Sequence, residues 1–262
     1  MATNTPTLSS LRITTSGNWR IEHALVTSVS VVCLILNVQS VSGGLNPSGI
    51  VTRMDGSEKK YFTVDLPFLT RTKLSSKNDK IRVHELRSKV DAIIIGNNTV
   101  RLDNPLLTVR HAQGKNPVRI ILDSSGTIKS NSKIIQTCNK VPTVIAVSEL
   151  ISEKNLQRLR KFSLEIIVCG KNSVNIQKLL GILLKKGIKK ILLEGGGTIN
   201  WSFVKKNLID EAIVTLAPYI IGGKNTISLV EGIGFKNLDN SIKLELKKIQ
   251  KNKNELVLFY KV

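Results

Sequence analysis

Three consecutive glycines, 195–197, are the strongest local signal in this sequence. They follow Glu194 at the end of an apolar stretch and precede Thr198, where a helix is expected to begin. Glycines let the backbone approach a ligand without an intervening Cβ, and the N–H groups at a helix start favour phosphate. The pattern is not the dinucleotide-binding motif GxGxxG, because Asn200 replaces its third glycine. The run predicts either a phosphate-binding turn or a loop that binds no ligand.

Polar side chains also crowd the stretch after Gly96, where another apolar strand is expected to end. Thr99 and Asp103 can hydrogen-bond a hydroxyl or an amide, and Arg110 can hold a phosphate through two parallel hydrogen bonds. Ligands of α/β sheets bind beyond the carboxyl ends of the strands, so a loop in this position favours a site. The other interpretation is a group of ordinary turn-forming residues.

A third candidate lies around His84 and Arg87. Arg87 could clamp an anion, or it could form a surface ion pair with Glu85 or another neighbour. We expect His84 to lie on a helix surface rather than to act in catalysis. The segment contains no HxxxH or HxE pattern and the three cysteines form no CxxC pair, so we predict neither a metal site nor a disulfide scaffold. This cysteine usage fits a reducing compartment.

The elements that must position these residues alternate between strands and helices. Apolar strands are expected at 91–95, 118–123, 141–147, 164–168, 190–194 and 212–217. Helices are expected from Ser75 or Ser76 to Val90, from Ser152, from a Ser173 cap to Gly187, and at 198–206. Two final strands, 243–249 and 255–260, flank a hairpin turn at 251–254. This order predicts an α/β fold whose central sheet is mainly parallel and flanked by helices, with an antiparallel C-terminal edge.

The net charge of the 262-residue chain is +20, from 39 basic and 19 acidic side chains. Such an excess fits a nucleic acid, a membrane surface or anionic small molecules as partners, or a lysine-rich solvated surface. The few aromatic residues are not interleaved with basic stretches, which argues against a stacking platform for single strands. Nucleic-acid binding therefore stays only as an alternative function.

The composition changes near residue 59, because residues 1–58 contain no lysine. The apolar run 24–38 is interrupted by Thr27, Ser28 and Ser30 and is too short for a membrane helix. It is a buried strand, a signal-like segment or an extension outside the fold. We predict an atypical segment at 1–62 and one main domain at 63–262.

Three stretches in chain order resemble the reductase family of riboflavin biosynthesis. They are KIRVHELRSKVDAIIIGNNTVRLDNPLLTVR, NPVRIILDSS and KKILLEGGGTINWSFVKKNLIDEAIVTLAPYIIGGK. The resemblance covers about residues 73–262 and implies a dihydrofolate-reductase-like α/β fold in a cytoplasmic homodimer. It also implies NADPH, or else NADH, as the reductant of a phosphorylated pyrimidine whose ribosylamino side chain becomes ribitylamino. The substrate would be 2,5-diamino-6-ribosylamino-4(3H)-pyrimidinone 5′-phosphate or, alternatively, the deaminated uracil analogue.

The resemblance also assigns site residues by position, although no catalytic acid among them. The residues implied for the cofactor are Thr99, Asp103, Ser124, Gly195, Gly196, Gly197 and Thr198. Those implied for the substrate are Arg87, Leu107, Arg110 and Glu194. Lys129, which follows the strand end at 123–124, is hypothesised to meet the 2′-phosphate of NADPH.

The chain departs from the family pattern at its amino end. The family opens with a strand that leads into Ser-x-Asp-Gly-Lys, whereas this chain has Asp65 but no Gly-Lys pair. Pro67 is also unfavourable inside a central strand. Residues 1–62 are therefore interpreted as a divergent extension or a misread gene start, and a relative without activity is a further alternative.

Overall fold

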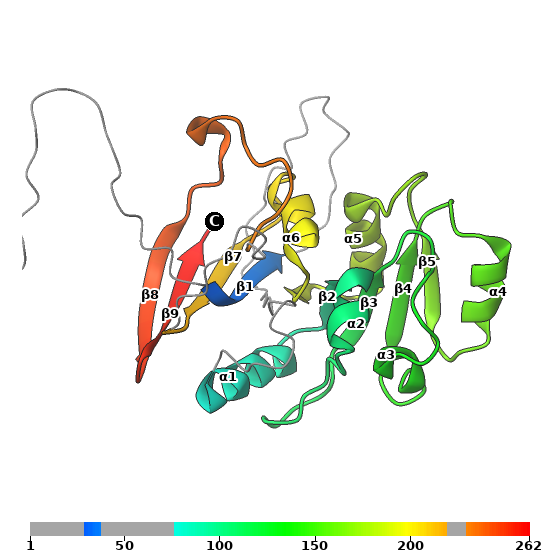
Figure 1. The fold of residues 1–262 in the computed structure, drawn as a ribbon, viewed down its shortest axis with the longest axis horizontal. Coiled ribbons are helices and arrows are strands. Elements are labelled where there is room, and N and C mark those ends of the chain that lie inside the picture. Colours follow the sequence, from blue (N-terminus) through cyan, green and yellow to red (C-terminus); the bar gives the residue numbers. More distant parts are fainter. Residues whose placement is uncertain (1–28, 38–75, 219–228) are drawn as a thin grey trace, which may run out of the picture.

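The computed structural model describes residues 29–37, 76–218 and 229–262. These residues form one nine-stranded sheet in the order β5-β4-β3-β2-β6-β1-β7-β9-β8, with helices packed against it. Figure 1 shows the strands fanned across the molecule, from β5 on one side to the β8–β9 hairpin on the other. No helix within the described residues is long and apolar enough to cross a membrane.

Five parallel strands form one side of the sheet. They are β2 (Ala92–Gly96), β3 (Val118–Leu122), β4 (Thr143–Val147), β5 (Glu165–Val168) and β6 (Lys190–Leu193). The inner strands are short runs of Val, Ile and Leu that are buried almost throughout, as expected for parallel strands covered on both faces. The prediction of a mainly parallel central sheet is confirmed.

The other side of the sheet is antiparallel. The strand β1 (Val29–Asn37) lies between β6 and β7 (Glu211–Leu216) and runs antiparallel to both. The hairpin of β8 (Glu245–Asn252) and β9 (Glu255–Lys261) then closes this edge. The apolar run at 24–38 therefore contains a strand, one of its three interpretations. The other residues of the predicted segment 1–62, and Asp65 and Pro67, lie outside the described residues.

The helices largely follow the predicted order. They are α1 (Lys77–Ser88), α2 (Asn97–Asp103), α3 (Lys133–Gln136), α4 (Glu153–Arg160), α5 (Ile176–Lys185) and α6 (Gly197–Val204). Ser76 and Ser152 cap α1 and α4, as expected. The predicted cap of α5 was wrong, because Asn175 rather than Ser173 accepts the exposed N–H, from Lys178.

The stretch after Gly96 is a helix, α2, and not the predicted loop. Gly96 is extended at its start and Asn104 ends it in the left-handed conformation (φ 43°). The buried Val100 packs one face of α2 against the core. A seven-residue helix rich in Asn and Asp carries little local signal, because these residues also form turns; packing of Val100 decides the outcome.

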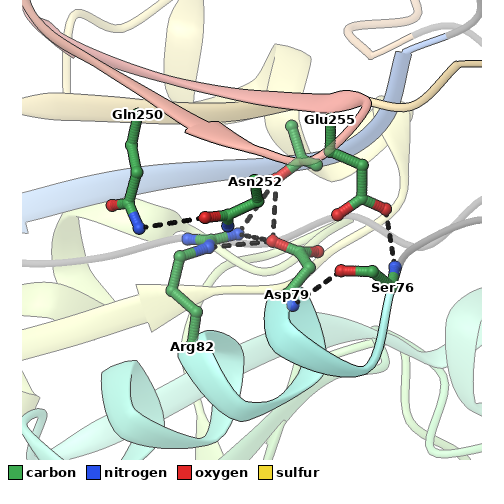
Figure 2. A network of polar contacts seen from close by, with 7 residues as sticks. Ser76, Asp79, Arg82, Gln250, Asn252 and Glu255 are labelled. Atoms are coloured by element: carbon green, nitrogen blue, oxygen red, sulfur yellow. Dashed lines mark hydrogen bonds and ion pairs between the residues drawn. The ribbon is translucent and has the colours of Figure 1, made fainter.

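A buried polar network ties the first half of α1 to the antiparallel strands (Figure 2). The fully buried Asp79 accepts hydrogen bonds from Arg82 Nε (2.8 Å) and from Thr215 of β7 (3.0 Å). The Ser76 N–H donates to Glu255 of β9 at 2.6 Å. The network therefore fixes α1 against the sheet, and the second half of this helix carries two of the candidate site residues.

Candidate active site

The two glycine-containing turns meet at the carboxyl edge of the sheet. Strands β2 and β6 are parallel neighbours, with Ile94 opposite Leu193, so the turns that follow them lie side by side. The N–H of Gly196, at the start of α6, donates to Thr99 Oγ1 of α2 at 3.2 Å. Two segments nearly a hundred residues apart in the chain thus form one structure, at the edge where ligands of α/β sheets bind.

Ile199 of α6 explains why two of these positions are glycine. A Cβ at Gly96 would lie 2.8 Å from Ile199 Cγ1, and a Cβ at Gly195 would lie 3.0 Å from Ile199 Cβ and Cγ2. A Cβ at Gly196 would meet Thr99 Oγ1 at 3.4 Å, an ordinary contact, and no other atom of the described residues within 4 Å. Internal packing therefore disfavours a side chain at Gly96 and Gly195, whereas among the described residues Gly196 has space for the close approach of a ligand.

The other residues implied for the cofactor lie around this turn or on the next strand. Asp103 is one helical turn from Thr99, so both lie on one face of α2. Ser124 follows β3, and its hydroxyl accepts a hydrogen bond from the Val174 N–H at 3.2 Å. The exposed Thr198 hydroxyl donates to Glu231 at 2.8 Å.

Asn97, in the first turn of α2, is a further candidate site residue, which the sequence interpretation did not single out. Its side-chain nitrogen donates to Thr127 at 3.0 Å, and Thr127 donates to Asp123 at 3.2 Å. Among the described residues, no group donates a hydrogen bond to the buried Oδ1 atom of Asn97. A buried acceptor of this kind calls for a further donor, so the β2–α2 turn suits a hydrogen-bonding ligand. Its place directly after Gly96 was the available signal.

Arg87 and Glu194, two of the residues implied for the substrate, form a buried, bidentate ion pair. Arg87 Nε and Nη2 donate to the two carboxylate oxygens of Glu194 at 2.6 and 2.5 Å. Arg87 also donates to the Thr108 carbonyl at 3.3 Å. The alternative of a surface ion pair with Glu85 was wrong, since the partner lies 107 residues away on the end of β6. Such a paired carboxylate is held rigidly at one place in the site.

The segment 104–110, which follows α2, forms the wall beside this pair. Leu107 is buried in the core and has φ 51°, a left-handed conformation that leucine rarely adopts. The preceding carbonyl, of Leu106, accepts a hydrogen bond from the buried Arg119 at 3.1 Å. The exposed Arg110 side chain donates to Thr108 Oγ1 at 2.6 Å. Leu107 therefore contributes core packing, and Arg110 presents its charge outward.

His84 is buried and not on the helix surface, contrary to the prediction. It is 5% exposed, and its Nδ1 atom accepts a hydrogen bond from the Arg110 backbone N–H at 2.9 Å. Its pKa is lowered to about 4, first by burial and then by the charges of Arg87, Arg110 and His111, against a smaller opposing effect of the Thr108 backbone. The sequence signal missed its burial because a helix of low amphipathicity does not reveal which face is covered.

A shallow cavity of about 200 Å³ lies beside α2. It is lined by Val100, Arg101, Asn104, Lys129, Asn131 and Ser132. The two cationic side chains make it suitable for an anionic group. Within the described ranges, no three His, Cys, Asp or Glu side chains gather as metal ligands would.

The fold is that of reductase domains from riboflavin biosynthesis. The structure titled Acinetobacter baumannii RibD, form 1, superposes with a TM-score of 0.62 and 22% sequence identity, over 74% of this chain and 52% of that chain. The predicted fold class, a dihydrofolate-reductase-like α/β fold, is thereby confirmed.

Sequence comparison identifies the family and its similar members. Residues 53–258 match the RibD C-terminal domain, and the chain belongs to this family. The chain is 44% identical to the 2,5-diamino-6-ribosylamino-4(3H)-pyrimidinone 5′-phosphate reductase of Aquifex aeolicus, over 63% of this chain and 73% of that protein. It is 38% identical to the same-named protein of Methanothermobacter thermautotrophicus, over 76% of this chain and 94% of that protein. The resemblance inferred from the sequence motifs, and the oxidoreductase class that it implied, are confirmed.

Proposed function

We propose that this protein uses NADPH to reduce 2,5-diamino-6-ribosylamino-4(3H)-pyrimidinone 5′-phosphate to its ribitylamino form. The observation that carries the proposal is the meeting of the two turns at Thr99 and Gly196 beside the buried Arg87–Glu194 pair. Relatives of similar length bear the name of this activity. The deaminated uracil analogue is the alternative substrate, and the names of these two relatives favour the diaminopyrimidine.

The cofactor would lie along the carboxyl edge of the sheet. Two features of the described residues support this placement: the space around Gly196 and the buried Asn97 Oδ1, to which none of them donates. The residues assigned to hold it are Thr99, Asp103, Ser124, Gly195, Gly196, Gly197 and Thr198. When bound, the nicotinamide would supply the hydride that is added at C1′ of the opened ribosylamine. The work of the chain is to hold donor and acceptor in a reactive geometry and to exclude water.

The substrate would lie against Arg87, Leu107, Arg110 and Glu194. Arg110 is exposed and carries the charge that would bind the phosphate. Glu194 is held in place by Arg87, and its remaining lone pairs can accept from an amino or hydroxyl group of the substrate. The backbone at Leu107 would line the sugar site.

The decisive experiment assays the purified full chain with NADPH and each of the two pyrimidine substrates. We expect NADPH oxidation and formation of the ribitylamino product, detected by mass spectrometry, with a kcat/KM about tenfold or more higher for the diaminopyrimidine. A reversed preference would assign the uracil analogue instead. The absence of NADPH oxidation with either substrate would refute the proposed function.

NADPH rather than NADH is supported by Lys129 and Arg101, which line the cavity beside α2. We assign Lys129 to the 2′-phosphate. The change Lys129→Met should raise the KM for NADPH about tenfold and leave the KM for NADH unchanged, since NADH lacks that phosphate. Lys140→Met, at another exposed lysine, is the matched control. An equal effect on both cofactors would contradict the assignment.

We also propose a homodimer in the cytoplasm, through the exposed face of the β8–β9 hairpin. Leu246 and Ile249 pair with Tyr260 and Leu258, two residues apart on β9, so a bulge in β8 places both apolar side chains on one face. They are 48% and 56% exposed, which favours a second copy as cover. Sedimentation should give a dimer for the wild type and a monomer for Leu246→Lys/Ile249→Lys; a monomeric wild type would refute it.

A further inference from the structure

We propose that His84 is a positioning residue for the substrate: its imidazole holds the backbone at Arg110 so that the guanidinium is presented to the substrate phosphate. The proposal rests on the proposed function, in which Arg110 binds that phosphate. It assigns a role to a side chain that the motif interpretation placed on the surface.

The geometry of the contact carries the proposal. The Arg110 N–H donates to His84 Nδ1 at 2.9 Å, joining α1 to a segment 26 residues further along the chain. The His111 ring packs edge-on against the His84 ring, with centroids 4.7 Å apart and an interplanar angle of 86°. Burial and this ring contact leave the imidazole little freedom, so its acceptor atom stays aimed at one backbone N–H.

The contact requires a neutral imidazole. A ring nitrogen that accepts a hydrogen bond carries no proton, so the proton of His84 resides on Nε2. Protonation of Nδ1 would replace the acceptor by a second donor facing the Arg110 N–H. It would also place a positive charge next to Arg87, Arg110 and His111, the cationic and titratable groups that face the ring.

Helix α1 forms two hydrogen bonds with the backbone of the segment 104–110. Arg87, one turn after His84, donates to the Thr108 carbonyl, and His84 accepts from the Arg110 N–H. One hydrogen bond is accepted by a carbonyl and the other is donated by an N–H. Together they restrain the backbone conformation between Thr108 and Arg110. Because the backbone at Arg110 is restrained, its side chain can point in fewer directions.

The test compares three variants of His84 in the full chain. His84→Leu removes the acceptor and should raise the KM for the phosphorylated substrate about tenfold, with kcat changed less than about twofold and the KM for NADPH unchanged. His84→Asn should restore most of the KM, because its amide oxygen reaches the position of Nδ1. His84→Gln reaches the position of Nε2 instead, so it should behave like His84→Leu and serves in its place if the leucine variant does not fold.

A double-mutant cycle with Arg110→Met separates positioning from a general structural role. In the Arg110→Met background, His84→Leu should change the substrate KM less than about twofold, because the group that it positions is gone. A full effect in that background, equal losses for NADPH and substrate, or an unchanged KM in both His84→Leu and His84→Gln would overturn the proposal.

The same cycle distinguishes this proposal from the proposed function. If Arg110→Met raises the substrate KM but removal of the His84 acceptor does not, only the positioning role fails. If Arg110→Met leaves the KM unchanged, the assignment of Arg110 to the phosphate fails first, and the role of His84 is overturned with it.

Discussion

Among single residues, the glycines of the β6–α6 turn differ in what they do. A Cβ at Gly195 would crowd Ile199 at 3.0 Å. Gly196 has open space among the described residues and an extended backbone (φ −64°, ψ 166°) that alanine also adopts. One glycine thus serves the fold and its neighbour is free to serve a ligand. The two effects can be measured apart.

The change Gly196→Ala should weaken NADPH binding about tenfold while leaving the thermal midpoint nearly unchanged. Its Cβ would stand where the cofactor is proposed to approach, but among the described residues it would meet only Thr99 Oγ1. Gly195→Ala is the contrasting variant, expected to lower the free energy of unfolding by about 1–3 kcal/mol through overpacking. Titration of NADPH fluorescence and urea unfolding measure both. Undiminished NADPH affinity in Gly196→Ala and in the larger Gly196→Val would contradict the cofactor site.

Arg119 is a second residue whose surroundings predict a large effect. Its fully buried guanidinium donates to five acceptors: the carbonyls of Leu106, Ile134 and Val141 and the hydroxyls of Thr137 and Thr143. Burial lowers its pKa to about 10, so it stays charged at neutral pH. Arg119→Met should lower the free energy of unfolding by about 3 kcal/mol, because buried acceptors lose their donors. Urea unfolding measures this, and the exposed Arg160→Met should change it by less than about 0.5 kcal/mol.

At the scale of elements, α1 is the part of the fold on which the proposed substrate site depends. Its first half is tied to β7 and β9 by the network around Asp79 (Figure 2). Its second half carries His84 and Arg87 to the segment 104–110. Removal of a residue of this network should therefore shift α1 and, with it, His84 and Arg87.

The change Asp79→Ala should lower the free energy of unfolding by about 3 kcal/mol or more, because it leaves the buried part of Arg82 without its carboxylate. It should also raise the substrate KM more than the KM for NADPH, since α1 contacts the proposed substrate side. Urea unfolding and steady-state kinetics test the two effects. Asp239→Ala, at an exposed aspartate, is the control. A stable variant with unchanged kinetics would show that α1 does not depend on this network.

At the scale of the whole molecule, we expect the stability of the fold to respond to pH through His84. In the folded state its pKa is lowered to about 4 from the model-peptide value of 6.5. Between these values the unfolded chain binds the proton more readily, so the free energy of unfolding falls as the pH drops through this window. Above pH 6.5 the residue is neutral in both states and contributes no pH dependence.

Urea unfolding at pH 7.5, 6.5, 5.5 and 4.5 should show this loss as a difference between wild type and His84→Asn. The wild type should lose up to about 3 kcal/mol more than the variant across the window, since each unit of pKa shift corresponds to about 1.4 kcal/mol. Parallel pH profiles for the two proteins would mean that His84 titrates normally in the folded protein.

The sequence by itself determined the alternation of most strands and helices, the family, and the residues of the two turns. These features depend on signals between near neighbours in the chain: apolar runs, a serine before a helix, and three glycines after a strand. Contiguous motifs of this kind keep their meaning whatever the rest of the chain does, so the alternation predicted the parallel sheet and its antiparallel edge.

The tertiary structure alone decided which side chains meet. Arg87 pairs with Glu194, 107 residues further along the chain. His84 is buried against the segment to which it is hydrogen-bonded. Residues 97–103 form a helix because Val100 packs into the core. Each outcome depends on contacts between distant parts of the chain, and the free energy of a buried ion pair or hydrogen bond depends on its surroundings rather than on its sequence neighbours. The spacing of residues along the chain does not indicate these surroundings, because they form only when the chain folds.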